Sequence, residues 1–192
     1  MQADAVQYLT PEEYLVVERA AGFRGEYHDG ARFPKQSGTW DHGRIVGAAA
    51  AELYCQRGDR DFYIAMYDLR VAIPRYNAFV YPDVVATCGR VDCLDECSDT
   101  LTDATFIIEV LSPLTKNYDR GDKFRFYRSL PSFSEYLILA QDEVRAEHYR
   151  RQPDGSWQLR EFVSRSDEVE LTSIGCRLRL DDVYTGVEFG RA

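Results

Sequence analysis

The chain has 192 residues and a formal net charge of −9, which suits a single domain over residues 1–192 with a core from about 8 to 190. This acidity disfavours a broad nucleic-acid surface, although it does not exclude a local one. No segment approaches the roughly 20 apolar residues of a membrane span, and Met1–Asp4 lacks the basic and apolar regions of a signal peptide. The five cysteines fit reduced thiols better than disulfides. We therefore expect a cytoplasmic protein without membrane association.

A helix and a hairpin are predicted at the start of the chain. Thr10–Glu13 combines a hydroxyl N-cap, a proline at the first helical position and a glutamate three residues after the cap. This pattern predicts a helix that runs to about Ala21. An Asp-Gly pair, favoured in two-residue turns, predicts a hairpin over residues 25–33. Strand alternation places Glu26 and His28 on one face of its first strand.

A second helix and two strands follow. The helix is predicted over Trp40–Arg57 from its apolar periodicity. Its buried stripe is predicted to consist of Ile45, Ala48, Ala49, Leu53 and Tyr54. Phe62–Met66 and Leu69–Ile73 are predicted to form strands, continuous with each other through a kink near Asp68. Pro74–Asn77 then turns the chain into the next strand.

An unusual carboxylate lies in the middle of the chain. The predicted strand Tyr81–Val85 contains Asp83, and after a polar loop the apolar strand Phe106–Leu111 is interrupted by Glu109. A carboxylate inside an apolar strand has to be paired, bound to a metal or protonated, because burying it bare is very costly. Glu109 is therefore the best single candidate for a functional side chain.

The helix predicted over Asp119–Tyr127 directs a lysine toward these strands. Lys123 lies on the same helical face as Phe126, Tyr127 and Leu130, by three- and four-residue spacing. Because a face with these residues is expected to turn inward, Lys123 should point at the sheet and at the two acids. Two acids on two strands, faced by a lysine, are the arrangement of a metal-dependent phosphodiesterase, in which charge on the phosphate has to be neutralised and a water activated.

The remaining chain is predicted to be mostly strand. The predicted strands are 134–140, 143–151, 157–163 and 176–180, and a helical turn begins at Asp181. No repeat or linker interrupts the pattern. The predicted fold class is therefore α/β, with a central mixed β-sheet flanked by helices.

Several short segments, taken in order, also carry a resemblance. They are Glu26–Gly30, His42, Asp68–Val71, Tyr81–Val84, Glu109–Pro113, Asp119–Lys123 and Glu135–Tyr136. Together they resemble the PD-(D/E)XK nuclease superfamily, and most closely its bacterial family of putative restriction-endonuclease-like proteins, over roughly residues 8–190. The superfamily motif has a lysine two residues after the glutamate, where this chain has Leu111. The resemblance implies that Lys123 replaces it from the following helix.

The resemblance implies a restriction-endonuclease-like fold and a Mg²⁺- or Mn²⁺-dependent endonuclease that cleaves DNA as a homodimer and leaves 5′-phosphate ends. Hard divalent cations prefer carboxylate, carbonyl and water ligands. The expected metal ligands are Asp83, Glu109 and the backbone carbonyl of Val110. Glu26 is expected to complete the shell, directly or through water. Lys123 is expected to orient the attacking water or to stabilise the pentavalent phosphorus.

Four further residues are candidates for the surroundings of this site. They are His42, Asp68, Arg120 and Tyr127. A histidine near a helix start is more often a capping or surface residue, Tyr127 more often belongs to the core, and Asp68 either bends a strand or contacts the site. Arg120 lies in a basic run with Arg125, which should contact phosphates in a nuclease and is otherwise a solvated helix face.

Two alternatives remain. A buried Glu109–Lys123 pair without metal would satisfy both charges. Together with the acidic net charge and Leu111 at the lysine position, it favours a catalytically inactive nucleic-acid-binding or assembly module on the same fold. The other alternative is a metal-dependent phosphatase that acts on a small phosphoester.

Overall fold

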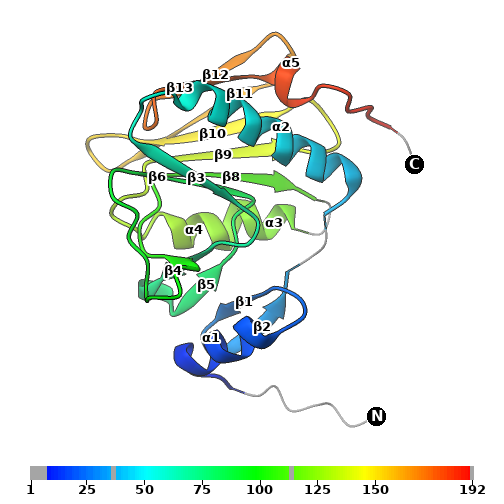
Figure 1. Cartoon of the computed structure of the whole chain (residues 1–192). Helices are drawn as coiled ribbons and strands as arrows, with labels where there is room; N and C mark the ends of the chain where they lie inside the picture. Colours follow the sequence, from blue (N-terminus) through cyan, green and yellow to red (C-terminus); the bar gives the residue numbers. More distant parts are fainter. Residues whose placement is uncertain (1–7, 36–37, 113–114, 191–192) are drawn as a thin grey trace.

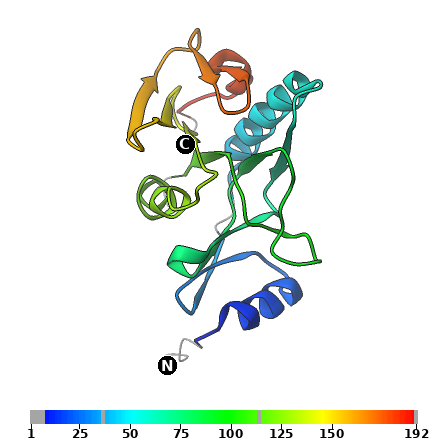
Figure 2. The same cartoon turned by 90° about the vertical axis from the view of Figure 1, so that its left-hand side faces the viewer.

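The computed structural model describes residues 8–35, 38–112 and 115–190 (Figure 1). Within these residues the strands form sheets of five, six and two strands. The six-stranded sheet is the centre of the fold and has helices on both faces (Figure 1, Figure 2). No helix in the described part of the chain is both long enough and apolar enough to span a bilayer.

The central sheet is mixed, as the sequence predicts. Its strands, in neighbouring order, are β11 (Trp157–Phe162), β10 (Ala146–Arg151), β9 (Glu135–Ala140), β8 (Phe106–Leu111), β6 (Val84–Cys88) and β3 (Phe62–Met66). β8 and β9 run parallel, whereas the other neighbours run antiparallel. Every residue of β8 and β9 is buried. This burial explains why both strands are nearly continuous apolar runs in the sequence.

Different elements cover the two faces of this sheet. One face packs against α2 (Trp40–Arg57), the strand pair β12 (Glu168–Leu171) and β13 (Cys176–Arg179), and α5 (Leu180–Val183). The other face packs against the helical segment 116–127 and the strands of the five-stranded sheet. The α/β class and the flanking helices predicted from the sequence are thus confirmed.

The helical segment 116–127 is divided by a π-helical turn. It consists of α3 (Lys116–Tyr118), the π turn η2 (Asp119–Lys123) and α4 (Phe124–Tyr127). Phe124, Phe126 and Tyr127 are buried against the sheet. The predicted inward face is therefore present, and Lys123 lies on it with only 4% of its surface exposed.

The five-stranded sheet lies at the N-terminal end of the molecule (Figure 1). Its strands, in neighbouring order, are β2 (Ala31–Pro34), β1 (Gly25–His28), β5 (Ala78–Val80), β4 (Arg70–Ile73) and β7 (Thr100–Leu101). The 3-10 turn η1 (Pro74–Tyr76) joins β4 to β5. Helix α1 (Pro11–Ala20) packs on this sheet, where the stacked rings of Tyr14 and Phe79 form part of a small apolar cluster.

Two local predictions are confirmed in detail. Thr10 and Glu13 form a capping box, in which the Glu13 N–H donates to Thr10 Oγ1 at 3.2 Å and the Thr10 N–H donates to Glu13 Oε2 at 2.8 Å. The β1–β2 turn consists of Asp29 and Gly30, both with positive φ (46° and 93°). Positive φ at both central residues is the conformation that favours the Asp-Gly pair.

The sequence-based assignment of strands needs four corrections. Asp83 does not lie within a strand, because residues 81–83 are irregular and β6 begins at Val84. β3 and β4 are not one kinked strand, because they belong to different sheets and are separated by Tyr67, which has a positive φ of 58°. The loop over residues 88–103 contains the two-residue strand β7, which is too short for alternation to be recognised. β12 is absent from the predicted elements, although its four residues alternate between exposed and buried.

The predicted stripe of α2 is partly wrong. Ile45, Ala49 and Leu53 are buried, but Tyr54 is 51% exposed, with its hydroxyl donating to Ile64 O at 2.9 Å. Ala48 is only partly buried. Instead, the stripe continues through His42, Val46 and Ala50. Pro113, which ends one of the segments that carry the resemblance, lies outside the described residues.

Candidate active site

A cavity of about 660 Å³ opens between the β1–β2 hairpin, the start of α2 and the helical segment 116–127. Its volume lies in the usual range of ligand pockets, about 300–1,000 Å³. Titratable side chains from five separate parts of the chain line it: Glu26, His42, Asp83, Glu109 and Lys123. They come from β1, α2, the segment before β6, β8 and η2.

Asp83 is buried and held from several sides. Its Oδ2 accepts a hydrogen bond from the Val110 N–H at 2.9 Å and lies 3.1 Å from His42 Nε2. Its Oδ1 lies 3.4 Å from Lys35 Nζ. Burial alone would raise the pKa of Asp83, but the His42 hydrogen bond and the Lys35 charge outweigh it and hold this pKa well below its usual range. Asp83 is therefore a carboxylate at neutral pH.

Glu109 is buried at the same cavity but titrates differently. Its Oε1 accepts hydrogen bonds from Lys123 Nζ at 3.0 Å and from Tyr127 OH at 2.8 Å. Burial raises the pKa of Glu109 to about 8; Lys123 opposes this rise, and the negative charges of Asp83 and Asp119 add to it. No described residue hydrogen-bonds Oε2. One oxygen of this carboxyl is thus left without a protein partner in the described part of the chain.

The ammonium group of Lys123 is the centre of the cluster. Nζ lies 3.0 Å from Glu109 Oε1, 3.1 Å from Glu26 Oε1 and 3.6 Å from Asp119 Oδ1. It also donates to Tyr81 O at 3.3 Å. Burial would lower the pKa of Lys123, but the three carboxylates raise it well above its usual value. The π-helical turn η2, a feature often found at functional sites, carries this lysine.

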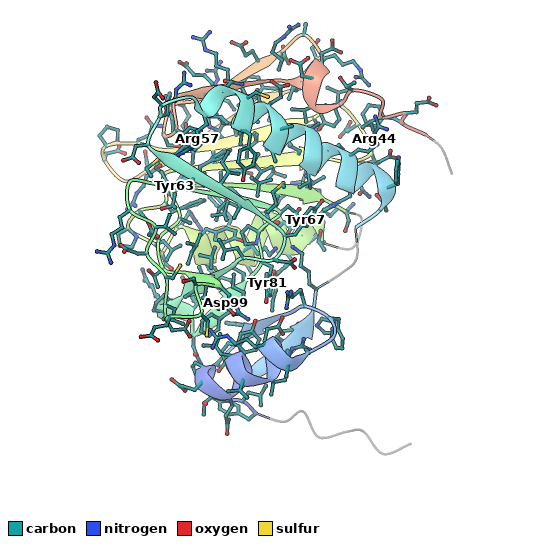
Figure 3. All side chains as sticks on the ribbon, viewed as in Figure 1. Arg44, Arg57, Tyr63, Tyr67, Tyr81 and Asp99 are labelled. Atoms are coloured by element: carbon teal, nitrogen blue, oxygen red, sulfur yellow. The ribbon has the colours of Figure 1, made fainter. Side chains whose placement is uncertain are left out.

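Glu26 completes the cluster from the hairpin side. Its Oε1 accepts from the Tyr81 N–H at 3.0 Å, and its Oε2 accepts from Tyr118 OH at 2.9 Å. Tyr81 lies between the hairpin and the central sheet (Figure 3). The Tyr81 hydroxyl donates to buried Glu18 at 2.9 Å and lies 3.3 Å from the Arg70 guanidinium. Tyr81, two residues before Asp83, is therefore held by Glu26 through its backbone and by Glu18 through its hydroxyl.

Leu111 shows why the lysine comes from a helix. It lies two residues after Glu109 on the same face of β8 and is buried in the apolar cluster under the helical segment 116–127. A charged side chain at this position would have to be buried among apolar groups. In this chain the cation beside Glu109 is Lys123.

The structure brings together most of the residues chosen from the sequence. Glu26, Asp83, Glu109 and Lys123 converge, and Val110 contacts Asp83 through its N–H. Whether the Val110 carbonyl binds a metal stays a prediction. His42 is neither a surface nor a capping side chain, because it is 8% exposed and its ring contacts Asp83. Tyr127, expected in the core, is buried there, and its hydroxyl reaches Glu109.

Two candidates lie differently from what the sequence suggests. Arg120 does not line the cavity; its guanidinium donates to Glu147 on β10 at 3.0 and 2.6 Å. Asp68 lies at the cavity rim, where its side chain is 75% exposed and pairs with Arg24 at 3.1 Å. Arg125, the other residue of the predicted basic run, also does not line the cavity; it pairs with Asp122 at 2.9 Å.

Three site residues were missed by sequence reasoning. Asp119 is 3% exposed, lines the cavity and lies four residues before Lys123, so the same helical spacing that selected the lysine could have found it. Tyr118, which binds Glu26, has no distinguishing pattern. Lys35 follows β2 in an irregular segment, and only the folded chain reveals its contacts with Asp83 and with Tyr81 O at 3.0 Å.

The donor chemistry of the cavity fits a hard divalent cation. Among the described residues, no three His, Cys, Asp or Glu side chains already form a metal-binding group. Even so, Asp83 Oδ1 has only the long contact to the Lys35 ammonium, and Glu109 Oε2 has no hydrogen bond from a described residue. Two oxygens of two buried carboxyls at one cavity are thus available, and oxygen is the donor that Mg²⁺ and Mn²⁺ prefer.

Sequence comparisons connect this geometry to known proteins. A family model described as "Uma2: Putative restriction endonuclease" matches residues 11–181. Two curated proteins of Synechocystis sp. are similar over nearly their whole length. The uncharacterized protein slr1290 is 34% identical over 94% of both chains. The uncharacterized protein sll1609 is 31% identical over 90% of this chain and 97% of its own.

A structural comparison agrees on the fold. The crystal structure of an Anabaena variabilis protein, described as a putative nuclease belonging to DUF820, superposes with a TM-score of 0.75. The match covers 92% of this chain and 98% of that one, at 16% sequence identity. At this identity the similarity establishes the shared architecture, and function has to be argued from the site.

Proposed function

Because the chain belongs to the Uma2 family of putative restriction endonucleases, we propose that it is a metal-dependent endonuclease that hydrolyses phosphodiester bonds in DNA. The family and the shared fold support nuclease chemistry in general. The observation that carries the specific proposal is the convergence of two buried acids, Asp83 and Glu109, with the ammonium of Lys123 at one cavity.

We assign the metal site to Asp83, which directly precedes β6, and Glu109 on β8. Asp83 and Glu109, with the Val110 carbonyl, would hold one Mg²⁺ or Mn²⁺ ion, and Glu26 would complete the shell directly or through water. Such an ion neutralises charge on the phosphate oxygens and lowers the pKa of a bound water. The Val110 N–H and His42 fix the orientation of Asp83, which is the usual task of groups behind a metal ligand.

Lys123 supplies a fixed positive charge next to this site. Its Nζ donates to Glu109 Oε1 and to the Tyr81 carbonyl and forms an ion pair with Glu26 at 3.1 Å. The carbonyl contact is the longest of these at 3.3 Å, and it is the one that a phosphate oxygen or the attacking water would replace. A cation that meets developing negative charge in the transition state contributes strongly to phosphoryl transfer.

A cleavage assay tests this proposal. Plasmid DNA and, separately, a single-stranded oligodeoxynucleotide are incubated with Mg²⁺ or Mn²⁺ and wild type, Asp83→Asn or Lys123→Met protein. Asp154→Asn is the control, with the same acid-to-amide change in an exposed turn. We expect both site variants to lose roughly 10²–10³-fold in rate and Asp154→Asn to match wild type. Equal cleavage by all four proteins, or none that depends on metal, would contradict the proposal.

One observation favours a second function. Lys123 already pairs with Glu26 and Glu109, and the described residues contain no ready metal-binding group. The same fold could thus act as a catalytically inactive module that binds nucleic acid or a protein partner. In that case wild type and Asp83→Asn would bind DNA equally and neither would cleave it.

The oligomeric state stays a prediction from the resemblance. We propose a homodimer, because a small nuclease domain that cuts both strands of DNA commonly acts as a pair. Sedimentation of the purified protein at several concentrations would measure it, and a monomer at all concentrations that cleave DNA would contradict it.

A further inference from the structure

The cavity carries three aromatic rings that remain exposed to solvent. Phe23 is 59% exposed, Phe33 is 53% exposed and Tyr67 is 36% exposed, and all three line the cavity that holds Asp83 and Glu109. Exposed large apolar side chains that gather at one concave site, rather than being scattered singly, mark a binding surface. A metal and a phosphate alone would not need these rings.

Phe33 is placed directly beside the acid cluster. It pairs with Glu26 across the β1–β2 ladder, so the two side chains project from the same face of the hairpin. β2 is the edge strand of its sheet. Because no further strand in the described part of the chain pairs with β2, the Phe33 ring is not covered by a neighbouring strand.

The Phe23 ring packs against the guanidinium group of Arg32. The guanidinium carbon of Arg32 lies 4.6 Å from the centre of its ring. Arg32 in turn donates to the buried Glu18 carboxylate at 2.7 Å and to Phe23 O at 2.7 Å. One face of the ring thus rests on a fixed cation and the ring is preorganised, which lowers the entropy cost of binding.

Tyr67 is joined to the site by its backbone and by a lysine. Its N–H donates to Asp83 O at 3.2 Å, and Lys35 Nζ lies 5.8 Å from its ring centre. Lys35 also contacts the Asp83 carboxylate. The cavity thus has rings on the hairpin side and on the β3 side, with the Lys35 ammonium next to the Asp83 carboxylate.

The lysine and arginine side chains that line the cavity are all paired with acids. Among the described residues Arg24 pairs with Asp68, Lys35 with Asp83, and Lys123 with Glu26 and Glu109. Affinity for duplex DNA depends on neutralising many phosphates with exposed lysine and arginine side chains. Single strands offer a further source of affinity besides their phosphates, because every base presents a π-face that can stack on an aromatic side chain.

We propose that this cavity binds an unpaired segment of a DNA strand, with bases stacked on Phe33, Phe23 and Tyr67 and with one phosphate at the Asp83–Glu109 site. The inference rests on the proposed function and names its substrate class. Stacking tolerates any base, so recognition of the strand would depend on its lack of pairing and not on its sequence. Paired bases keep their π-faces within the duplex and cannot reach the rings.

Fluorescence anisotropy tests the binding. A labelled oligodeoxynucleotide, as a single strand or annealed to its complement, is titrated with full-length wild-type protein in Ca²⁺, a hard cation that carboxylates can hold, and a gel checks that the oligonucleotide stays intact. We expect the single strand to bind more tightly, Phe33→Ala to weaken it about 5- to 100-fold, and Phe33→Trp to restore it. Tyr63→Ala is the matched control, because Tyr63 is 46% exposed and Figure 3 shows it at the opposite end of β3 from Tyr67.

Two outcomes would overturn the inference. One is duplex binding as tight as or tighter than single-strand binding, and the other is the same affinity for Phe33→Ala and Tyr63→Ala. Cleavage of the same two substrates with Mn²⁺ separates this inference from the proposed function. Preferential cleavage of the duplex by both wild type and Phe33→Ala would support the nuclease and refute the unpaired substrate. Tight single-strand binding without cleavage would support the stacking site and refute the nuclease.

Discussion

Glu109 and Glu135 are buried glutamates on neighbouring parallel strands, 2% and 0% exposed, yet the protein treats them in opposite ways. They lie on opposite faces of the sheet. Glu109 is next to Ile138 in the apolar cluster under the helical segment 116–127, whereas Glu135 is next to Phe106 in the cluster under α2. The same side chain in the same sheet therefore has two environments that can be compared directly.

Both oxygens of Glu135 are fully used. Thr172 donates to Oε1 from its N–H and hydroxyl at 3.1 and 2.9 Å, and Ser173 donates to Oε2 at 2.8 and 2.5 Å. His148 Nε2 lies 3.3 Å away. Burial would raise the pKa of Glu135, but these hydrogen bonds outweigh it and lower the pKa below its usual value. This carboxylate ties the turn between β12 and β13 to the central sheet.

Glu109 has the opposite character. Its pKa is raised to about 8 by burial, one of its oxygens has no hydrogen bond from a described residue, and it borders a cavity. The difference teaches that burial alone does not identify a functional acid. A carboxyl that the protein leaves incompletely satisfied next to a cavity and a fixed cation is the better candidate.

The largest expected effect is on cleavage. Glu109→Gln should lower the metal-dependent cleavage rate roughly 10²–10³-fold, because it removes a proposed metal ligand, whereas Glu135→Gln should cleave like wild type. The measurement is the initial rate on plasmid DNA for protein that is folded by circular dichroism. The contrast between the glutamates would break down if Glu135→Gln lost as much activity as Glu109→Gln.

Stability should respond in the reverse order. Glu135→Gln replaces one acceptor oxygen by an amide that cannot accept from Thr172 or Ser173, which leaves buried donors unpaired and should cost about 2–4 kcal/mol in the free energy of unfolding. Glu109→Gln should cost less, because it removes a carboxyl whose ionisation burial already disfavours. Urea denaturation at neutral pH measures both. A larger loss of stability for Glu109→Gln than for Glu135→Gln would contradict the structural role assigned to Glu135.

The pH dependence of stability should also have opposite signs, with a smaller effect. In EDTA, Glu109 keeps its proton in the folded state from its ordinary pKa of 4.5 up to about 8, so its contribution to stability falls as pH rises through this window. Glu135 has a lowered pKa, so its contribution is present above its ordinary value of 4.5 and is lost as pH falls through the folded value. Denaturation midpoints measured against pH should lose the first slope in Glu109→Gln and the second in Glu135→Gln. Unchanged slopes in both variants would contradict these assignments.

Local sequence patterns identify Glu109 as a functional candidate, but they do not identify Glu135 as a structural acid. Glu109 and Lys123 are recognisable because one interrupts an apolar strand and the other shares a helical face with aromatic residues. Glu135 is not recognisable as a structural acid, because its partners Thr172 and Ser173 lie 37 and 38 residues further along the chain. Such pairings depend on how the strands come together, which periodicity does not encode.

The same reasoning explains the misplaced basic residues. Arg120 and Arg125 form a basic run in the sequence, but residues five apart lie about 140° from each other on a regular helix. Arg120 pairs with Glu147 on β10, a partner 27 residues away in sequence that local spacing does not reveal. The fold class, the hairpin and the main helices follow from local patterns, whereas the single-domain organisation and the metal stay predictions.

Calorimetric titration with Mn²⁺ tests the central claim most directly. Wild type, Glu109→Gln and Glu135→Gln are titrated under identical conditions above pH 8, where Glu109 is ionised. We expect saturable binding to wild type and to Glu135→Gln, and its loss in Glu109→Gln. Binding that is identical in all three proteins, or absent from wild type, would show that the acid left open at the cavity holds no metal.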